Sequence, residues 1–474
     1  MKRLCPLLPA LAALLAIAAC AATPCRAPST AERAQINALI PQLINARHVP
    51  GLELGLACNG KLVFDRGFGL RDREHHLPVA AATSFQIGSI TKQFTAAAIL
   101  QLRDAGKLSL NDHVARFLPH FPDAGRITIR ELLNQTTGLY NYTEAPHFVA
   151  YTARHHGSFA AITALLRSHA LAFAPGTRWQ YSNTNYIVLG QIVALASGEP
   201  WTAWVREHIF APAGMHATGI IGDALPNRAR GYSYAQGNVV PAPPLPELWA
   251  GSAGAIVSDV ADLERWDTAL SDGKLISRAD YREMTAAGRL AGGKTDSYGF
   301  GWMLGTYGNQ PTIWHNGGTF GFLALNARLP QAGLDVIVLT NSTQLAPWSV
   351  AHAVLHIIAP LPAQAAAPRP AAGEEKAITA RVLQAVGWAM SGHFDRTQLA
   401  PQMNAALTPA TIRAVAANLA GMGKLQSLSF RRKGAIHGQS VYWYLARFAN
   451  GELNVIYSLN PKGKISGFVL RPVQ

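Results

Sequence analysis

The fold is decided by one stretch of the chain, which reads Phe85-Gln86-Ile87-Gly88-Ser89-Ile90-Thr91-Lys92-Gln93-Phe94-Thr95-Ala96. Apolar residues recur in this stretch at helical spacing, which predicts a buried helix that begins close to Ser89. Side chains three residues apart share one helix face, so Ser89 and Lys92 are expected to point into the same space. A single S-x-x-K spacing arises by chance in long chains, and alone it indicates no chemistry.

A serine beside a lysine suits nucleophilic catalysis. A serine hydroxyl becomes a strong nucleophile only when a neighbouring group takes its proton. Lys92 can take that proton if burial or the nearby helix end lowers its pKa. The free N–H groups at the same helix end would also stabilise an oxyanion formed beside Ser89.

Two later segments carry residues that fit the same chemistry. Tyr181 and Asn183 form a Y-x-N triplet, in which the phenol can share proton transfer with a lysine and the amide can hold the lysine and a substrate carbonyl. His315 and Gly317 form H-x-G in a late strand region, where glycine allows close approach to the backbone and histidine offers a donor. Each motif also has a structural reading: an aromatic loop before a helix that begins near Tyr186, and a histidine of the core.

In this order, the three motifs resemble those of the class C β-lactamase, D-aminopeptidase and D-Ala-D-Ala carboxypeptidase superfamily, the penicillin-recognising serine hydrolases. The resemblance covers about residues 30–358 and extends to four further stretches, at 127–139, 212–215, 254–263 and 298–302. It implies an antiparallel sheet flanked by helices, with a helical region alongside, and a reaction that passes through an acyl-enzyme.

The resemblance also implies a role for each motif residue. Ser89 would attack a carbonyl, while Lys92 and Tyr181 would transfer protons, with the identity of the base left open between these two. The backbone N–H groups of Ser89 and Gly318 would form the oxyanion hole. The substrate side of the site would be completed by three further residues, Asn183, His315 and Gly317.

Two positions depart from the family pattern. Gln135 stands where the family often has a histidine, and it is expected to change only the wall of the pocket. His315 replaces the lysine that typical β-lactamases carry in K-T-G, where a permanent cation attracts the substrate carboxylate. A histidine with an ordinary pKa of about 6.5 is mostly neutral at pH 7. Family members with H-x-G are typically D-aminopeptidases, carboxypeptidases or esterases, so the expectation moves away from β-lactams.

The expected function is therefore hydrolysis of D-amino-acid peptides or amides, or of small esters, through an acyl-enzyme. Peptidoglycan stem peptides are one expected class of substrate. Two alternatives stay open: a β-lactamase or penicillin-binding protein, and a non-catalytic sensor or binding protein that retains the pocket. No metal and no cofactor are expected, because the sequence contains no H-E-x-x-H and no zinc-type spacing of histidines.

Residues 1–22 are interpreted as a secretory signal, because a positively charged start precedes an apolar run and then small residues. Ile17-Ala18-Ala19-Cys20 resembles a lipobox, so a lipid anchor at Cys20 competes with cleavage after residue 22. The protein is expected to be exported, either periplasmic, secreted or a lipoprotein. Cys25 and Cys58 would then meet an oxidising compartment, where they either pair or remain free thiols.

The formal net charge of +14 is spread along the chain, and its densest basic cluster is Arg431-Arg432-Lys433. Nucleic-acid binders concentrate their positive charge, so no nucleic-acid partner is expected. The oligomeric state stays open.

Secondary-structure patterns divide the chain at a Pro- and Ala-rich stretch, residues 359–373, which is interpreted as a semi-extended linker. The large unit, 30–358, has helical patterns in its middle and at its ends, and strand patterns at 51–58, 61–67, 312–314, 320–329 and 334–339. The small unit, 374–474, has two helical patterns and then strand patterns at 424–433, 438–448, 452–459 and 464–471. In its order of elements it resembles the NTF2-like domains. The predicted fold class is α/β of the α+β type, with a small C-terminal α+β domain.

Overall fold

The structure is a computed structural model, and it describes residues 25–308, 310–360, 375–436, 438–449 and 451–472. The proposed signal at 1–22, with Cys20, and most of the proposed linker at 359–373 lie outside the described residues. Among the helices that are described, none is both long enough and apolar enough to cross a membrane.

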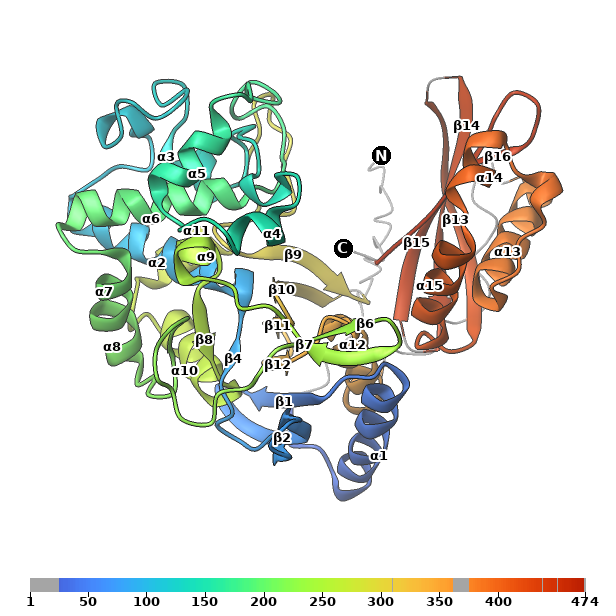
Figure 1. Ribbon diagram of the computed structural model, residues 1–474, viewed down its shortest axis with the longest axis horizontal. Helices are drawn as coiled ribbons and strands as arrows, with labels where there is room; N and C mark the ends of the chain where they lie inside the picture. The colour runs from blue at the N-terminus through green and yellow to red at the C-terminus, as the bar shows by residue number, and fades with distance from the viewer. Residues whose placement is uncertain (1–24, 309, 361–374, 437, 450, 473–474) are drawn as a thin grey trace, which may run out of the picture.

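A seven-stranded antiparallel sheet forms the centre of the large unit (Figure 1), in the order β3-β2-β1-β12-β11-β10-β9. The strands span β1 Gly51–Cys58, β2 Lys61–Asp72, β3 Leu77–Pro78, β9 Met303–Tyr307, β10 Gln310–Thr319, β11 Phe322–Leu329 and β12 Leu334–Thr340. The first hairpin turns at Asn59 and Gly60, both with positive φ, as expected for this dipeptide between two strands. Strands from the two ends of the unit thus meet at the middle of one sheet.

Helices cover both faces of this sheet. On one face, α1 Thr30–Ala46 and α12 Pro347–Ile358 pack on alternate residues of β1, such as Leu52, Leu54 and Leu56. On the other face lie α10 Val260–Ser271 and the helical region around α2 Thr91–Asp104. Residues 91–100 of α2 are all buried, so this helix forms the centre of the larger core.

The remaining elements of the large unit lie between β3 and β9 in the sequence. The helices are α3 Ile129–Leu133, α4 Phe148–Thr152, α5 Phe159–Leu166, α6 Asn183–Ser197, α7 Trp201–Val205, α8 Ala211–Ala213, α9 Glu247–Gly254 and α11 Arg278–Met284. The short strands are β4 Phe85–Gln86, β5 Gly219–Ile220, β6 Tyr232–Ala235, β7 Asn238–Pro241 and β8 Ile256–Ser258.

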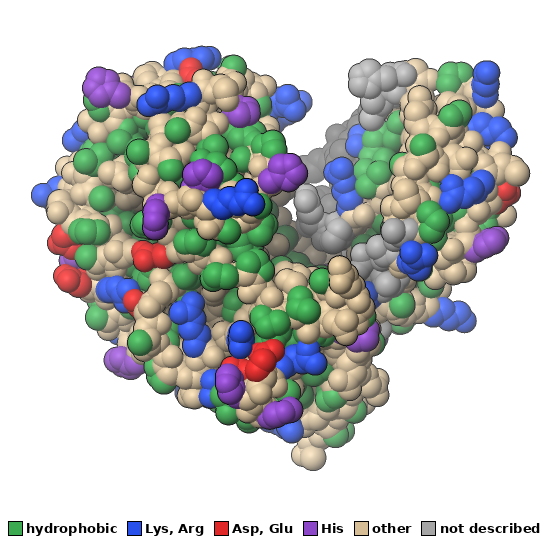
Figure 2. Space-filling view, viewed as in Figure 1, with side chains coloured by type: hydrophobic (Ala, Val, Ile, Leu, Met, Phe, Trp, Pro, Cys, Tyr) green, Lys and Arg blue, Asp and Glu red, His purple; other side chains and the backbone are tan. Residues whose placement is uncertain are grey.

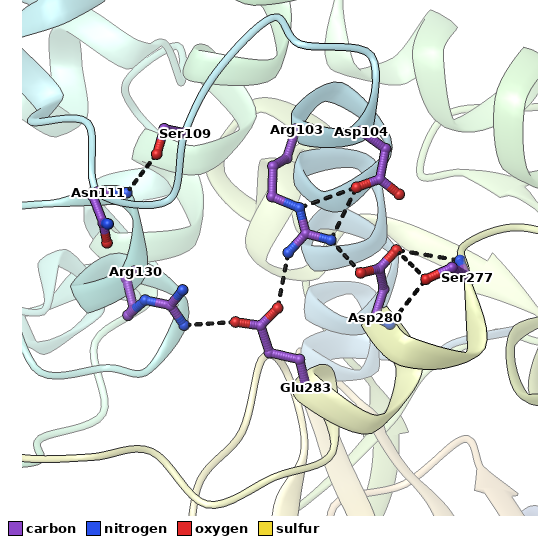
Figure 3. A network of polar contacts seen from close by, with 8 residues as sticks. All are labelled: Arg103, Asp104, Ser109, Asn111, Arg130, Ser277, Asp280 and Glu283. Carbon is purple, nitrogen blue, oxygen red and sulfur yellow. Dashed lines mark hydrogen bonds and ion pairs between the residues drawn. The ribbon is translucent and has the colours of Figure 1, made fainter.

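An ion-pair network ties the end of α2 to its neighbours (Figure 3). Arg103 donates to Glu283 at 2.8 Å and also pairs with Asp104 and Asp280, while Arg130 of α3 pairs with Glu283 at 2.8 Å. Two arginines thus share one carboxylate, so α2, α3 and α11 are held together by charge as well as by apolar packing. A network of this kind contributes more to the stability of the fold than a single exposed ion pair does.

The small unit has its own sheet and its own core. Its four strands pair in the order β13-β14-β15-β16. They span β13 Leu425–Ile436, β14 Gln439–Phe448, β15 Gly451–Leu459 and β16 Ile465–Pro472, and the helices are α13 Lys376–Ser391, α14 Pro401–Ala406 and α15 Pro409–Ala420. Tyr442, Tyr444 and Phe448 are buried in the core between sheet and helices, while Trp443 lies on the opposite side of β14, beneath Arg432.

The predicted fold class is confirmed, because the molecule combines antiparallel sheets with helices. Every predicted strand appears, but β2 and β10 each end five residues later than predicted. Cys25 and Cys58 form a disulfide, which decides between the two alternatives left open by the sequence. On the face drawn in Figure 2, Lys and Arg side chains are scattered over both units rather than gathered into one patch.

Candidate active site

Ser89 lies on a tight turn directly before α2. The sequence predicted a helix that begins close to Ser89, and the structure has a 3₁₀ turn at Gly88–Ile90 that runs into α2 at Thr91. Gly88 has φ +51°, which favours glycine, and a Cβ there would lie 2.5 Å from the Gly318 nitrogen. The turn therefore brings Ser89 against the end of β10.

Lys92 is fully buried and contacts Ser89 directly. Its Nζ lies 3.0 Å from Ser89 Oγ, 2.8 Å from Asn183 Oδ1 and 2.8 Å from the carbonyl oxygen of Ala253. The last of these belongs to the final turn of α9, where carbonyls have no partner within the helix. No carboxylate is among these partners, and burial holds the pKa of Lys92 well below its ordinary value.

The geometry around Nζ suits a neutral amine. A neutral lysine has two N–H groups and one lone pair, and two of its three partners here are carbonyl oxygens, which can only accept. If Asn183 and Ala253 take the two N–H groups, the lone pair is left to accept the proton of Ser89. This is the arrangement that a general base for Ser89 requires.

Tyr181 stands beside the same pair. Lys92 Nζ lies 5.0 Å from the centre of its ring. Burial raises the pKa of Tyr181 above its ordinary value, and an interaction with the Ser89 side chain partly opposes this rise. The phenol therefore keeps its proton near neutrality, which suits a proton donor better than a base.

Two residues outside the three motifs hold the Y-x-N segment. Gln135 is fully buried, and its Oε1 accepts hydrogen bonds from Ser182 N at 3.0 Å and Asn185 Nδ2 at 2.5 Å. Asn141 Oδ1 accepts from the backbone N–H of Asn183 at 3.1 Å. Gln135 was visible only as a departure from the family pattern, and no local signal marked Asn141. α6 consequently begins at Asn183, three residues before the predicted start near Tyr186.

His315 is buried and engaged inside the protein. Its Nδ1 lies 2.6 Å from the carbonyl oxygen of Asn316, so Nδ1 carries the hydrogen, and its Nε2 then accepts from the Tyr298 hydroxyl at 3.1 Å. Burial lowers the pKa of His315 to about 3. The ring is neutral, as expected, but both nitrogens are occupied, so it presents no free donor to a substrate.

The glycines of the third motif allow β10 to lie against the Ser89 turn. A Cβ on Gly317 would lie 1.8 Å from the carbonyl oxygen of Ile87 and 3.2 Å from the Ser89 nitrogen. Gly318 follows and lines the cavity in front of Ser89. The two N–H groups expected to form the oxyanion hole, those of Ser89 and Gly318, therefore belong to segments in direct contact.

A cavity of about 830 Å³ opens in front of Ser89. Its polar lining includes Ser89, Asn183, Thr143 and Thr319, but most of its wall is apolar, with Ala145, Phe148, Val149, Ala150, Ala153, Pro243, Leu245, Trp249, Ala250, Ala253 and Phe320. Among the described lining residues there is no Lys, Arg, Asp or Glu, and His147 is the only basic side chain.

Possible metal ligands gather elsewhere among the described residues. Glu264, Asp267 and Asp335 form one buried group, and Glu199, Glu207 and His208 form another. Arg328 already pairs with Asp335 at 3.0 Å, so the buried group has a cation of its own. Neither group lines the cavity at Ser89.

The fold and the Ser89–Lys92 pair together define a serine hydrolase of the β-lactamase and transpeptidase type. The chain belongs to the β-lactamase family, whose model matches residues 36–358. This confirms the resemblance inferred from the three motifs.

Individual relatives agree with this assignment. A penicillin-binding protein of Bacillus subtilis is 31% identical over 342 residues, which make up 67% of this chain and 74% of that protein. The crystal structure of a D-stereospecific amidohydrolase from Streptomyces is similar with a TM-score of 0.59 and 27% identity, over 70% of this chain and 99% of that one. The octameric penicillin-binding protein homologue from Pyrococcus abyssi covers 91% of this chain and 94% of its own, with a TM-score of 0.64, and at 21% identity it supports the fold alone.

Proposed function

We propose that this protein hydrolyses D-amino-acid amides and peptides, or small carboxylic esters, through an acyl-enzyme formed on Ser89. The observation that carries the proposal is the buried Lys92, which lies 3.0 Å from Ser89 Oγ and has no carboxylate partner among the described residues. The similarity to a D-stereospecific amidohydrolase supports amide substrates, and the replacement of the third-motif lysine by His315 supports substrates other than β-lactams.

In the first half of the reaction, Ser89 Oγ attacks the substrate carbonyl while Lys92 Nζ takes the hydroxyl proton. The N–H groups of Ser89 and Gly318 stabilise the oxyanion. The bond to the leaving group then breaks, and Tyr181 donates its proton to the departing nitrogen or oxygen. Lys92 returns a proton to Tyr181, so the pair ends this half in its starting state.

In the second half, a water molecule replaces the leaving group. Lys92, whose amine is again neutral, takes a proton from that water as its oxygen bonds to the acyl carbon. The bond between the acyl carbon and Ser89 Oγ breaks, and the proton passes to Oγ. The products are the free carboxylic acid and the original enzyme.

Hydrolysis of D-alanyl-p-nitroanilide and p-nitrophenyl butyrate by the mature protein tests this function, with Ser89→Ala as control. We expect turnover of at least one substrate that the control loses, together with labelling of Ser89 by a fluorophosphonate probe. Turnover that survives in Ser89→Ala would refute the assignment of the nucleophile. A Ser89 that neither reacts with the probe nor turns over substrate would favour the sensor alternative.

We also propose that the protein is exported and acts on peptidoglycan stem peptides or small molecules outside the cytoplasm. The disulfide between Cys25 and Cys58 supports export, since disulfides persist in oxidising compartments. The intact mass of the protein recovered from the cell envelope tests the two processing routes. A mass that matches a chain starting at residue 23 indicates a cleaved signal. A mass that matches a chain starting at Cys20 with added acyl chains indicates a lipoprotein.

A further inference from the structure

We infer that the cavity at Ser89 selects uncharged substrates with an apolar acyl chain, which makes esters of medium-chain acids its preferred class. This inference rests on the proposed function and narrows it. It is argued from the residues that line the cavity and from the neutral, hydrogen-bonded ring of His315. Both observations are independent of the assignment of Ser89 as the nucleophile.

The cavity offers an incoming charge no partner. A substrate carboxylate is ordinarily held by Arg or Lys, and a free α-ammonium by a carboxylate, because a charge that loses its water without a partner costs several kcal/mol. The described lining contains neither kind of residue. His147 lies at the exposed rim rather than at the base of the cavity.

The third motif leads to the same conclusion. In a K-T-G motif the lysine would supply a cation beside the substrate, but His315 is neutral and both of its ring nitrogens are engaged, by Asn316 and Tyr298. Lys92 contacts Ser89 but is itself buried, and its Nζ is engaged by Asn183 and Ala253. Neither residue is therefore available to a substrate carboxylate.

Most residues of the cavity wall are apolar, and three of its aromatic rings pack against one another. Phe148 lies edge-to-face on Tyr142 and Trp249, with ring centres 5.6 Å and 5.8 Å apart. At the rim, Val149 leaves 48% of its surface exposed. An apolar acyl chain would cover this surface, and each methylene removed from water contributes a favourable free energy of transfer. The cavity volume of about 830 Å³ also leaves room for far more than an acetyl group.

The test compares p-nitrophenyl esters of increasing acyl length, from acetate through butyrate to hexanoate, with the p-nitrophenyl monoester of succinic acid. Succinyl and butyryl groups have the same number of carbons, but the succinyl group ends in a carboxylate. We expect kcat/KM to rise about two- to fourfold per added methylene up to hexanoate, and the succinyl ester to be at least tenfold slower than the butyrate. Equal rates for the butyryl and succinyl esters, or no gain with length, would overturn the inference.

Three variants locate the selectivity. Leu245→Lys places a cation in the wall, and we expect it to lower kcat/KM for hexanoate about tenfold while reducing the disadvantage of the succinyl ester. Leu245→Met keeps an apolar wall and should keep the chain-length preference. Leu195→Lys adds the same charge at an exposed leucine outside the cavity lining, so it should leave both substrates unaffected.

Failure of the inference differs from failure of the proposed function. Turnover that depends on Ser89 but is restricted to free D-amino-acid amides, or that favours the charged ester, would leave the serine hydrolase intact and refute the apolar selectivity. Loss of all turnover that depends on Ser89, with no labelling by the fluorophosphonate probe, would instead refute the proposed function.

Discussion

At the scale of single residues, the site depends on how Lys92 is kept neutral. The side chain is buried without a carboxylate, and its two carbonyl partners leave the lone pair for Ser89. Because burial lowers the pKa of Lys92, more of the lysine is in the basic form at neutral pH than an exposed lysine would be.

Replacing Lys92 tests this assignment. We expect Lys92→Met to lower kcat by about three orders of magnitude, because the general base is lost. Lys92→Arg should be equally inactive, since arginine does not release its proton in proteins. In the wild type, kcat/KM should fall as the pH drops through the lowered pKa of Lys92. A fall in kcat/KM at the ordinary pKa of lysine, or an active Lys92→Arg variant, would contradict this role.

Gln135 is a second residue whose contribution can be measured. Gln135→Met keeps the size of the side chain but leaves the Ser182 N–H and the Asn185 amide without their acceptor. We expect the free energy of unfolding to fall by about 2 kcal/mol and kcat/KM to fall at least tenfold, because Tyr181 and Asn183 flank this contact. Thermal melts and steady-state kinetics measure both effects. Gln180→Met, at an exposed glutamine of the same segment, is the control and should change neither.

The residues that could be predicted from the sequence are those with a fixed local spacing. The three-residue interval between Ser89 and Lys92 is a property of one helical turn, and the structure confirms that the two side chains meet. Asn141 and Ala253 reach the site from loops and helix ends far along the chain, and only tertiary packing brings them there. His315 was identified, but its neighbours Tyr298 and Asn316 decide what its ring can contact.

At the scale of elements, the essential contact joins β10 to the turn that carries Ser89. A Cβ on Gly317 would overlap the carbonyl oxygen of Ile87, whereas a Cβ on Gly318 would meet only Leu323 Cδ2 at 3.3 Å. The same strand therefore contains one glycine without room for a side chain and one beside it where a methyl group requires only a small shift of the Leu323 side chain.

This difference provides a matched pair of variants. Gly317→Ala must separate β10 from the turn, so we expect kcat to fall by about 100-fold or more, the effect of losing one oxyanion donor. Gly318→Ala keeps the backbone N–H and the distance between β10 and the Ser89 turn, so kcat should fall by less than about tenfold. Steady-state kinetics with p-nitrophenyl butyrate compare the two. Similar losses in both variants would show that the close approach of β10 is not what the site requires.

The elements themselves could be predicted well where local chemistry specifies them. The Asn59-Gly60 turn and the strands it joins are confirmed, because positive φ at both residues matches the twist of a hairpin. α6 begins at Asn183, three residues before the start near Tyr186 that the structural reading of the motif implied. The Asn183 N–H at this start donates a partly buried hydrogen bond to Asn141, which no sequence pattern predicts.

At the scale of the whole molecule, buried carboxyl groups make stability depend on pH. Glu53 lies on β1, an interior strand of the sheet, and is fully buried. Burial raises the pKa of Glu53 well above its ordinary value, and the neighbouring carboxyls of Asp65 and Asp259 raise it further. The folded protein thus holds a proton that the unfolded chain releases at a lower pH.

The sign of the effect follows from linkage. Because the folded state binds more protons than the unfolded state, stability should decline as the pH rises from about 4.5 through the raised pKa of Glu53. We expect Glu53→Gln to flatten this decline and to raise the melting temperature at pH 8. Melting temperatures between pH 4.5 and pH 8 test this, with Glu452→Gln in the small unit as a partly exposed control. A wild type that becomes more stable over this range would contradict the protonated state of Glu53.

The pairing of Leu52 with Thr340 also determines when this protein can fold. During synthesis β1 can pair early with β2, which follows it directly in the sequence. Its other edge pairs with β12, which leaves the ribosome only after almost the entire large unit. Contacts between such distant positions close slowly, because a long loop must be ordered before they form. We therefore expect the sheet of the large unit to close only after Thr340 has been synthesised, late in the production of the 474-residue chain.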